Sequence, residues 1–444
     1  MFAKLILAVV FLLAGGCAAP QAVGERVPRR DRLHHFQSTL AALRGLEFRR
    51  EVSVELKSEA EIKLYFQRDL ELEYGDHRLA HIALAYAKLG LLPKGTDLKK
   101  ILIELYGTQV VAFYDPRAGK LVLPDGMSRW LAMDGQPAAA ERDVASEMVL
   151  AHELTHALQD QHFSLGEKLK PSADGDRDLA LRAVAEGDAT LSGYGYLFGG
   201  LDGRSLAETS RAVQDSLKEA RSSMAGVPEA LVEELLFQYY GGVAFVSRLL
   251  AERGWSGVDR LYASPPLSTE QVLHPEKYFA LADPPTTIEL KNLSSLFSPE
   301  WVEIENEVLG ELMAQVLFKQ FLPESEAKLI AGGWDGDRFV AFRRGGEIAF
   351  IWATVWDSEK DAEEFTRGYQ EILAKKYSGA GADGNFYLES RDQRAIVVEG
   401  LGRNFVKEKI AAVWQGMALK QEPANTPFAP VSNAVPAAIK PILP

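Results

Sequence analysis

Cysteine is almost absent from this sequence, because Cys17 is the only one among 444 residues. An exported protein that needed disulfides would carry an even set of cysteines, so a single cysteine excludes a fold held together by disulfides. An excess of basic residues is also missing, and the formal net charge is -13. This acidic balance argues against nucleic acid as a partner and against binding to anionic lipid through charge alone.

Long hydrophobic runs are scarce as well. The first residues, MFAKLILAVVFLLAGGC, place one lysine before an apolar run from Leu5 to Leu13, and small residues then lead up to Cys17. That apolar run is too short to span a bilayer. Its layout is typical of a bacterial export signal, which predicts that residues 1–16 are a signal peptide.

The single cysteine lies where this signal should be cut. The stretch AGGC resembles a lipobox, the site at which bacterial lipoproteins are acylated and cleaved, so we expect Cys17 to become the lipidated first residue of the mature protein. Residues 17–32 would then link the protein to the periplasmic side of a membrane, and we expect the outer membrane. The usual leucine three places before the cysteine is Ala14 here, and Leu13 lies one position further back. The alternative is a plain secretory signal with an incidental cysteine.

Residues 33–290 combine helical periodicity with a few strand patterns. Residues 48–58 alternate apolar and polar side chains, which indicates a strand, and Ser58 can cap the helix that follows. Residues 108–125 hold two apolar runs around Asp115-Pro116 and Gly119, which predicts a hairpin. The proline-rich residues 264–279 cannot form one regular element. Helices are expected at 33–43, 59–74, 77–90, 96–106, 141–162 and 177–198 and over most of 205–255.

The character of the sequence changes after about residue 290. We expect a helix near 302–321, followed by two strand-strand-helix units in residues 337–377 and 384–415. This repeated order predicts an α+β accessory domain over residues 291–420. The segment has no clustered histidine, cysteine or carboxylate residues, so we assign it no chemistry. Residues 421–444 are rich in proline and alanine, and a disordered tail is expected there.

The most informative stretch is AHELTHALQDQHF, residues 151–163, which contains the motif His-Glu-x-x-His. On a helix, positions i and i+4 lie on the same face, so His152 and His156 can both direct a ring nitrogen at one metal ion. Glu153 lies beside them and can accept a proton from an attacking water without itself binding the metal. The alternative is a pair of hydrogen-bonded core histidines, but Glu153 would then be buried without a stated partner. A metal site is therefore the favoured prediction.

Two residues compete for the third ligand position. His162 has the spacing of the long metzincin motif H-E-x-x-H-x-x-G-x-x-H, but Gln159 replaces the glycine that breaks the helix in that motif. If the helix continues, His162 points to the opposite face. Glu186 lies on the next helical segment among small and apolar neighbours, and folding that helix back would complete a site of two histidines and one glutamate. Asp188 is a weaker competitor that could instead orient one histidine through its far ring nitrogen.

Together, the stretches VLAHELTHALQDQHF and ALRAVAEGDATL resemble the gluzincin branch of zinc metallopeptidases, the clan of thermolysin. They are more closely similar to a group of largely uncharacterised bacterial exported peptidases, which VVAFYDPRAGKLVL and STEQVLHPEKY also match. The resemblance implies a zincin-like catalytic domain in residues 33–290, mostly helical with a small sheet. It also implies one zinc ion held by His152, His156 and Glu186, with Glu153 as general base. In thermolysin the third ligand lies in a longer acidic motif, whereas this chain has EGDAT.

Two further roles follow from the resemblance. Gluzincins bind a substrate peptide as an added strand beside the metal, so we expect Gln109–Tyr114 to be the edge strand that receives it. They also direct a histidine or tyrosine at the oxyanion. We expect His274 in this role because it lies in a proline-bounded loop, with Tyr239 and Tyr240 as alternatives. The competing interpretation of His274 is a loop histidine that bonds only local backbone.

The sequence therefore predicts a lipid-anchored zinc endopeptidase of the cell envelope that hydrolyses bonds of a peptide or protein substrate. Two alternatives stay open. A catalytically silent zinc-binding scaffold or chaperone in envelope assembly would keep the same residues. A metzincin-like protease would use His162 in place of Glu186.

Overall fold

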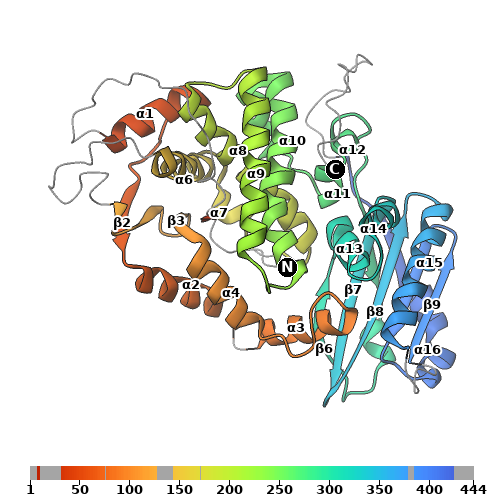
Figure 1. The fold of residues 1–444 in the computed structure, drawn as a ribbon. Coiled ribbons are helices and arrows are strands. Elements are labelled where there is room, and N and C mark those ends of the chain that lie inside the picture. The colour runs from red at the N-terminus through yellow and green to blue at the C-terminus, as the bar shows by residue number, and fades with distance from the viewer. Residues whose placement is uncertain are drawn as a thin grey trace.

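The computed structural model describes residues 8–10, 32–75, 77–127, 144–170, 172–378 and 385–424. Helices and several small sheets are combined in this chain, so the predicted α+β class is confirmed. Figure 1 shows the helices of the N-terminal part on one side and the larger sheet of the C-terminal part on the other. Cys17, most of the predicted linker and residues 425–444 of the predicted tail lie outside the described residues.

The N-terminal helices begin and end close to where the sequence patterns place them. Ser58 caps α2 as predicted, since its side chain accepts a hydrogen bond from the backbone of Glu61 and the Glu61 carboxylate accepts one from the backbone of Ser58. Gly90 ends α3 with a φ of 107°, which glycine adopts without steric cost. The elements of this region are α1 (Arg32–Arg44), β2 (Ser53–Lys57), α2 (Glu59–Tyr74), α3 (Arg78–Leu89), α4 (Leu98–Gln109), β3 (Val110–Asp115) and β4 (Lys120–Pro124).

A four-stranded sheet in the order β1-β3-β4-β2 lies against helix α6 (Val144–Phe163). β3 and β4 form the predicted hairpin, and β2 runs parallel to β4. The strand expected at Gln109–Tyr114 is β3, which begins one residue later because Gln109 ends α4, and in the full chain β1 (Ala8–Val10) pairs antiparallel with it. β1 is short and apolar with two β-branched residues, a composition that suits pairing with a strand edge.

Helices α6, α8 and α10 form the centre of the N-terminal part, with α8 packed against both of the others. α8 and α10 reach backbone contact at Gly187 and Gly242, where a Cβ atom on Gly242 would lie 2.0 Å from the carbonyl oxygen of Ala183. Glycine in a helix interior costs about 1 kcal/mol relative to alanine, so close packing must offset that cost here. The elements are α6, α7 (Leu165–Lys168), α8 (Gly175–Phe198), α9 (Gly203–Ser223), α10 (Glu229–Leu261), α11 (Thr269–Leu273) and α12 (Pro275–Phe279).

A five-stranded antiparallel sheet in the order β6-β7-β8-β10-β9 dominates the C-terminal part. The two predicted strand-strand-helix units are confirmed as β7-β8-α15 and β9-β10-α16. The helix predicted near 302–321 was wrong in its first part, because residues 302–307 pair with β7 and the helix begins only at Gly310, which has a φ of 78°. The elements are β5 (Thr286–Leu290), a 3-10 turn (Leu293–Leu296), β6 (Val302–Glu307), α13 (Gly310–Lys319), α14 (Glu324–Ala331), β7 (Trp334–Arg344), β8 (Glu347–Trp356), α15 (Glu359–Lys376), β9 (Phe386–Arg391), β10 (Arg394–Glu399), α16 (Arg403–Gly416) and β11 (Met417–Gln421).

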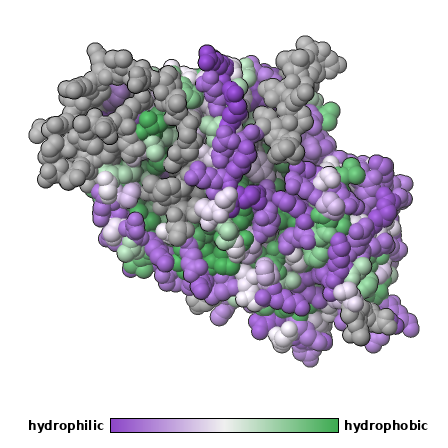
Figure 2. All heavy atoms as spheres, in the orientation of Figure 1, coloured by the Kyte–Doolittle hydropathy of each residue, from purple (hydrophilic) through white to green (hydrophobic). Residues whose placement is uncertain are grey.

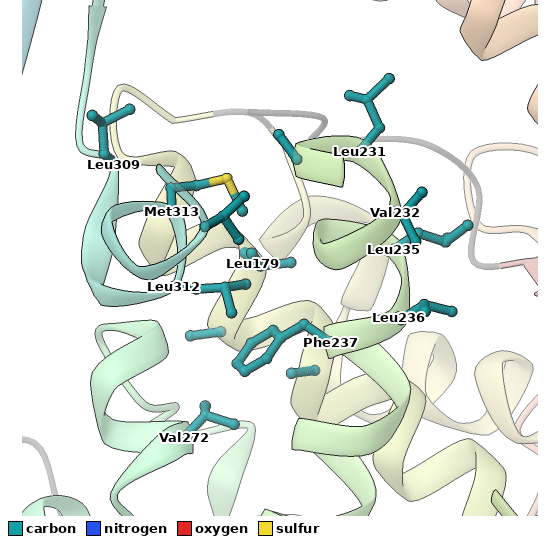
Figure 3. Close-up of a cluster of buried hydrophobic side chains, with 14 of the residues drawn as sticks. Leu179, Leu231, Val232, Leu235, Leu236, Phe237, Val272, Leu309, Leu312 and Met313 are labelled. Carbon is teal, nitrogen blue, oxygen red and sulfur yellow. The ribbon is translucent and has the colours of Figure 1, made fainter. Parts of the chain in front are cut away.

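One hydrophobic core runs through both parts of the molecule. Figure 3 shows a section of it, in which Leu179 of α8, Phe237 of α10 and Val272 of α11 lie near Leu312 and Met313 of α13. The same cluster continues to the strands of the larger sheet. The N-terminal helices and the C-terminal sheet therefore share their buried surface.

Polar contacts and strand pairing strengthen this connection. The ammonium group of Lys376 on α15 donates to both carboxylate oxygens of Glu399 on β10, and also to the backbone carbonyls of Lys88 and Leu89 at the end of α3. β5, which belongs to the segment predicted as the catalytic domain, pairs with β11 at the far end of the sequence.

Polar and apolar residues both reach the surface of the N-terminal part (Figure 2). α9 forms a hydrophilic ridge on the face shown in Figure 2 and turns Leu206, Val213 and Leu217 inward. Within the described part of the chain, no helix has both the length and the apolar character that crossing a membrane requires.

Candidate metal centre

Helix α6 turns leucines toward the small sheet and the two histidines of the motif toward α8. Leu150, Leu154 and Leu158 pack with residues of the small sheet and α1 in a hydrophobic cluster of their own. His152 and His156 contact α8, which folds back against α6 and brings Glu186 to them. One ligand atom from each of these three side chains lies within 4.8 Å of the others, and no second group of this kind occurs among the described residues.

The three side chains direct their ligand atoms at one small space. His152 Nε2 lies 3.0 Å from His156 Nε2 and 3.1 Å from Glu186 Oε2. His156 Nε2 lies 3.8 Å from the same carboxylate oxygen. The two imidazole planes are nearly perpendicular, at 82°. Two imidazole nitrogens and one carboxylate oxygen are donors that a divalent cation such as zinc accepts, so the residues present fit a metal ion.

Burial sets the charge of the centre. Burial lowers the pKa of His152 to about 3 and that of His156 to about 4, so both rings are neutral at pH 7. Burial also raises the pKa of Glu186 to about 7, although His156, Arg182 and a hydrogen bond from Tyr239 act in the opposite direction. Neutral imidazoles are the form that binds metals, and a cation would displace any proton from the Glu186 carboxylate.

Glu153 lies beside the ligand group without belonging to it. Its side chain is completely buried. One carboxylate oxygen, Oε2, accepts a 2.7 Å hydrogen bond from the backbone N–H of Tyr114 in β3. The carboxylate is therefore joined to the strand that was expected to receive a substrate.

Sequence reasoning missed the role of Gln159. Its amide oxygen lies 2.8 Å from His156 Nδ1, and its amide nitrogen donates to the carbonyl oxygen of Ala185 at 2.9 Å and to Asp188 Oδ2 at 3.1 Å. Asp188 was expected to orient a histidine directly, and it reaches His156 through this amide instead. The available signal was the glutamine at the position where the metzincin motif has glycine.

Tyr239 reaches the centre from α10. Its side chain makes a hydrogen bond with Glu186, which helps to keep that carboxylate ionised. The close approach of Gly242 to Gly187 explains this placement, because Gly187 follows Glu186 directly and Gly242 lies one turn beyond Tyr239. Paired glycines at 241 and 242, inside a predicted helix, were the signal for this contact in the sequence.

The structure does not bring His274 to the centre. His274 Nε2 lies 2.9 Å from Glu311 Oε1 on α13. Thr269, at the start of α11, donates its hydroxyl to Asp176 at the beginning of α8. A helix rises about 1.5 Å per residue, which separates Asp176 from Glu186 by roughly 15 Å along α8. The assignment of His274 to the oxyanion is therefore not supported, because α11 and α12 hold it near the start of α8.

The two remaining candidates also bond elsewhere. The hydroxyl of Tyr240 donates to Glu233 at 2.8 Å. His162 Nε2 lies 2.7 Å from the backbone carbonyl oxygen of Glu47. α6 continues to Phe163, as expected for a helix in which glutamine replaces the metzincin glycine, and His162 is turned away from the ligand group.

Comparison with known proteins gives one match. Residues 299–408 match the family model of a domain of unknown function (DUF8575). This segment lies in the C-terminal part and contains none of the residues of the metal centre. No curated protein and no solved structure matches the chain. These comparisons assign no chemistry to the metal centre.

Proposed function

We propose that this protein is a zinc-dependent endopeptidase of the cell envelope with a zincin-like catalytic part. The observation that carries the proposal is the convergence of His152, His156 and Glu186 on one point, with Glu153 beside them but outside the ligand group. Two neutral imidazoles and one carboxylate suit zinc, and three protein ligands leave room for a substrate, as catalytic zinc sites require.

When bound, zinc would polarise the carbonyl group of the scissile peptide bond and make an attacking water more acidic. Glu153 would accept a proton from this water at a carboxylate oxygen and transfer it to the leaving amine. Tyr239 would turn its hydroxyl from Glu186 to the carbonyl oxygen of the substrate as negative charge develops there. In this proposal Tyr239 takes the role that the sequence had assigned to His274.

β3 would bind the backbone of the substrate as a neighbouring strand. In the full chain β1 takes that place, and β1 lies within the residues predicted to be removed as a signal peptide. Cleavage before Cys17 would therefore free the edge of β3 and, with acylation of Cys17, leave the protein attached to the membrane.

A second function, a metal-binding scaffold without peptidase activity, is favoured by one observation. The exposed fractions of His152, Glu153 and His156 are 0%, and that of Glu186 is 1%. A buried centre can hold a metal for structural purposes, whereas a peptidase must admit a substrate to it. The two functions predict different results when Glu153 is changed.

The test is zinc content combined with cleavage of casein and quenched peptides by residues 18–444. Glu153→Gln is the test variant, and Glu147→Gln on the same helix is the matched control. We expect zinc in all three proteins, cleavage by the wild type and Glu147→Gln, and a loss of about 10²–10⁴-fold in Glu153→Gln. Zinc without cleavage in the wild type would select the scaffold. A wild type without zinc would contradict both functions.

A further inference from the structure

The hydrogen bond between His156 and Gln159 determines which ring nitrogen carries the proton. The Gln159 amide nitrogen faces two acceptors, the carbonyl oxygen of Ala185 and Asp188 Oδ2, and neither of them can donate. The amide oxygen must therefore be the atom that faces His156 Nδ1 at 2.8 Å, and it can only accept. Nδ1 carries the proton as a result, and Nε2 keeps its lone pair toward the metal centre.

Asp188 is the point at which this amide is fixed. Its Oδ2 atom accepts hydrogen bonds from Gln159, from the hydroxyl of Tyr262 at 2.8 Å and from Arg44 Nη2 at 3.0 Å. Asp188 has no exposed surface, so a buried positive charge is needed to balance its carboxylate. Arg44 supplies that charge.

Arg44 connects this network to the N-terminal helix. It is the last residue of α1, its guanidinium also bonds Asp259 at 2.9 Å, and it lies over the ring of Trp255 at 4.3 Å. α1 thus inserts a buried cation between α8 and α10. The chain that leads into α1 is the predicted membrane linker.

The two histidines differ in the hydrogen bonding of their Nδ1 atoms. Among the described residues, Nδ1 of His152 is buried and has no hydrogen-bond partner. Only His156 is supported by Gln159 at Nδ1, so the loss of this amide should change the tautomer of His156 and leave that of His152 as it is.

We propose that Gln159, Asp188 and Arg44 are positioning residues that hold His156 in the tautomer that binds metal, and that they couple metal binding to the docking of α1. The proposal rests on the metal site of the proposed function, and it adds to that site a dependence on the N-terminal helix. Coupling of this kind is reciprocal, so metal bound at the centre should in turn hold α1 in place.

The first experiment measures zinc affinity by chelator competition in the full chain. Gln159→Leu removes the amide, and Gln161→Leu is the matched control. Gln161 is a buried glutamine on the same helix whose oxygen accepts from the backbone of Arg49 and Arg50. We expect zinc affinity to fall about 10–100-fold in Gln159→Leu and to stay within about threefold of wild type in Gln161→Leu. Equal affinities in the two variants would overturn the proposal.

A spectroscopic readout separates positioning from general damage to the fold. Histidine ¹⁵N NMR of the metal-free protein should show His156 protonated at Nδ1 in the wild type and in Gln161→Leu. A mixture of tautomers is expected in Gln159→Leu. If Gln159→Leu does not fold, Asp188→Asn provides the same test, because it keeps the shape of the side chain and removes the charge that fixes the amide. An unchanged His156 signal in the folded variant contradicts the proposal.

The coupling to α1 is tested by hydrogen exchange of residues 32–44 with and without zinc. Zinc should slow exchange in the wild type, and this effect should be lost in Arg44→Gln. Exchange in α1 that does not respond to zinc in the wild type would overturn the coupling. A wild type that binds no zinc would instead remove the proposed function, so the two failures can be told apart.

Discussion

The contact between α8 and α10 predicts that Gly242→Ala lowers the free energy of unfolding. The added Cβ would lie 2.0 Å from the carbonyl oxygen of Ala183, 2.8 Å from its carbonyl carbon and 3.0 Å from the backbone nitrogen of Gly187. These atoms belong to the backbone of a buried helix and cannot rotate away, so the two helices must separate by about 1.4 Å to lengthen the shortest distance to the 3.4 Å of an ordinary contact. A clash with backbone atoms at this distance falls at the upper end of the about 1–3 kcal/mol that overpacking costs, while alanine recovers about 1 kcal/mol of helix propensity. We expect a net loss of about 2 kcal/mol in the free energy of unfolding.

The same shift should weaken the metal centre, because Tyr239 and Glu186 lie on the two helices that move apart. Urea unfolding and zinc affinity are the measurements. Gly203→Ala is the matched control, since a Cβ there meets no atom within 4 Å and the position begins α9. We expect Gly203→Ala to leave stability and zinc affinity unchanged. A Gly242→Ala protein as stable as wild type would show that the contact between α8 and α10 is not the close fit described above.

Three further predictions concern the centre and its surroundings. Glu186→Ala should lose zinc while His162→Ala keeps it, as metal analysis of the two purified variants will show; the reverse result would favour a metzincin-like site. Removal of residues 1–16 should raise peptide cleavage relative to the full chain, because β1 no longer pairs with β3, and equal rates in the two proteins would count against β3 as the substrate strand. In the metal-free protein, the contribution of His152, His156 and Glu186 to stability should fall as pH falls from 6.5 to 4.5. At about pH 5.5 the unfolded chain holds about two protons on these groups, both on the histidines, whose pKa values of about 3 and 4 keep them unprotonated in the folded state, whereas the folded chain holds about one, on Glu186 with its pKa of about 7. The net difference of one proton corresponds to roughly 1.4 kcal/mol per pH unit, and a His152→Ala, His156→Ala double variant with the same pH slope in urea unfolding as wild type would contradict it.

The local elements and the ligand group could be predicted because their signals lie within short stretches of sequence. Ser58 capped its helix as expected, the hairpin formed around Asp115, and the spacing of His152 and His156 placed both rings on one face of α6. Glu186 was found because its neighbours are small and apolar, which indicates a buried position. Each of these inferences depends on periodicity or on nearest neighbours along the chain.

The remaining features depend on long-range packing that no short stretch contains. His274 had the right chemistry for an oxyanion role, but its partner is Glu311 of α13. The helix before it, α11, bonds the start of α8 and is thereby kept away from the metal centre. Arg44 lies 144 residues from Asp188 in the sequence, and no local pattern connects them. The pairing of β1 with β3 likewise could not be foreseen from a segment whose composition indicates an export signal.

The shared hydrophobic core makes the distant sheet a potential indicator of metal occupancy. Trp334, Trp352 and Trp356 are fully buried in β7 and β8, far along the chain from the histidines but within the same cluster as the residues of α8. A ligand that binds only the folded state stabilises everything that unfolds together with its site. Tryptophan fluorescence of the C-terminal sheet should therefore follow thermal unfolding at a higher temperature when zinc is present, and the chain would carry its own optical probe of whether the centre is filled.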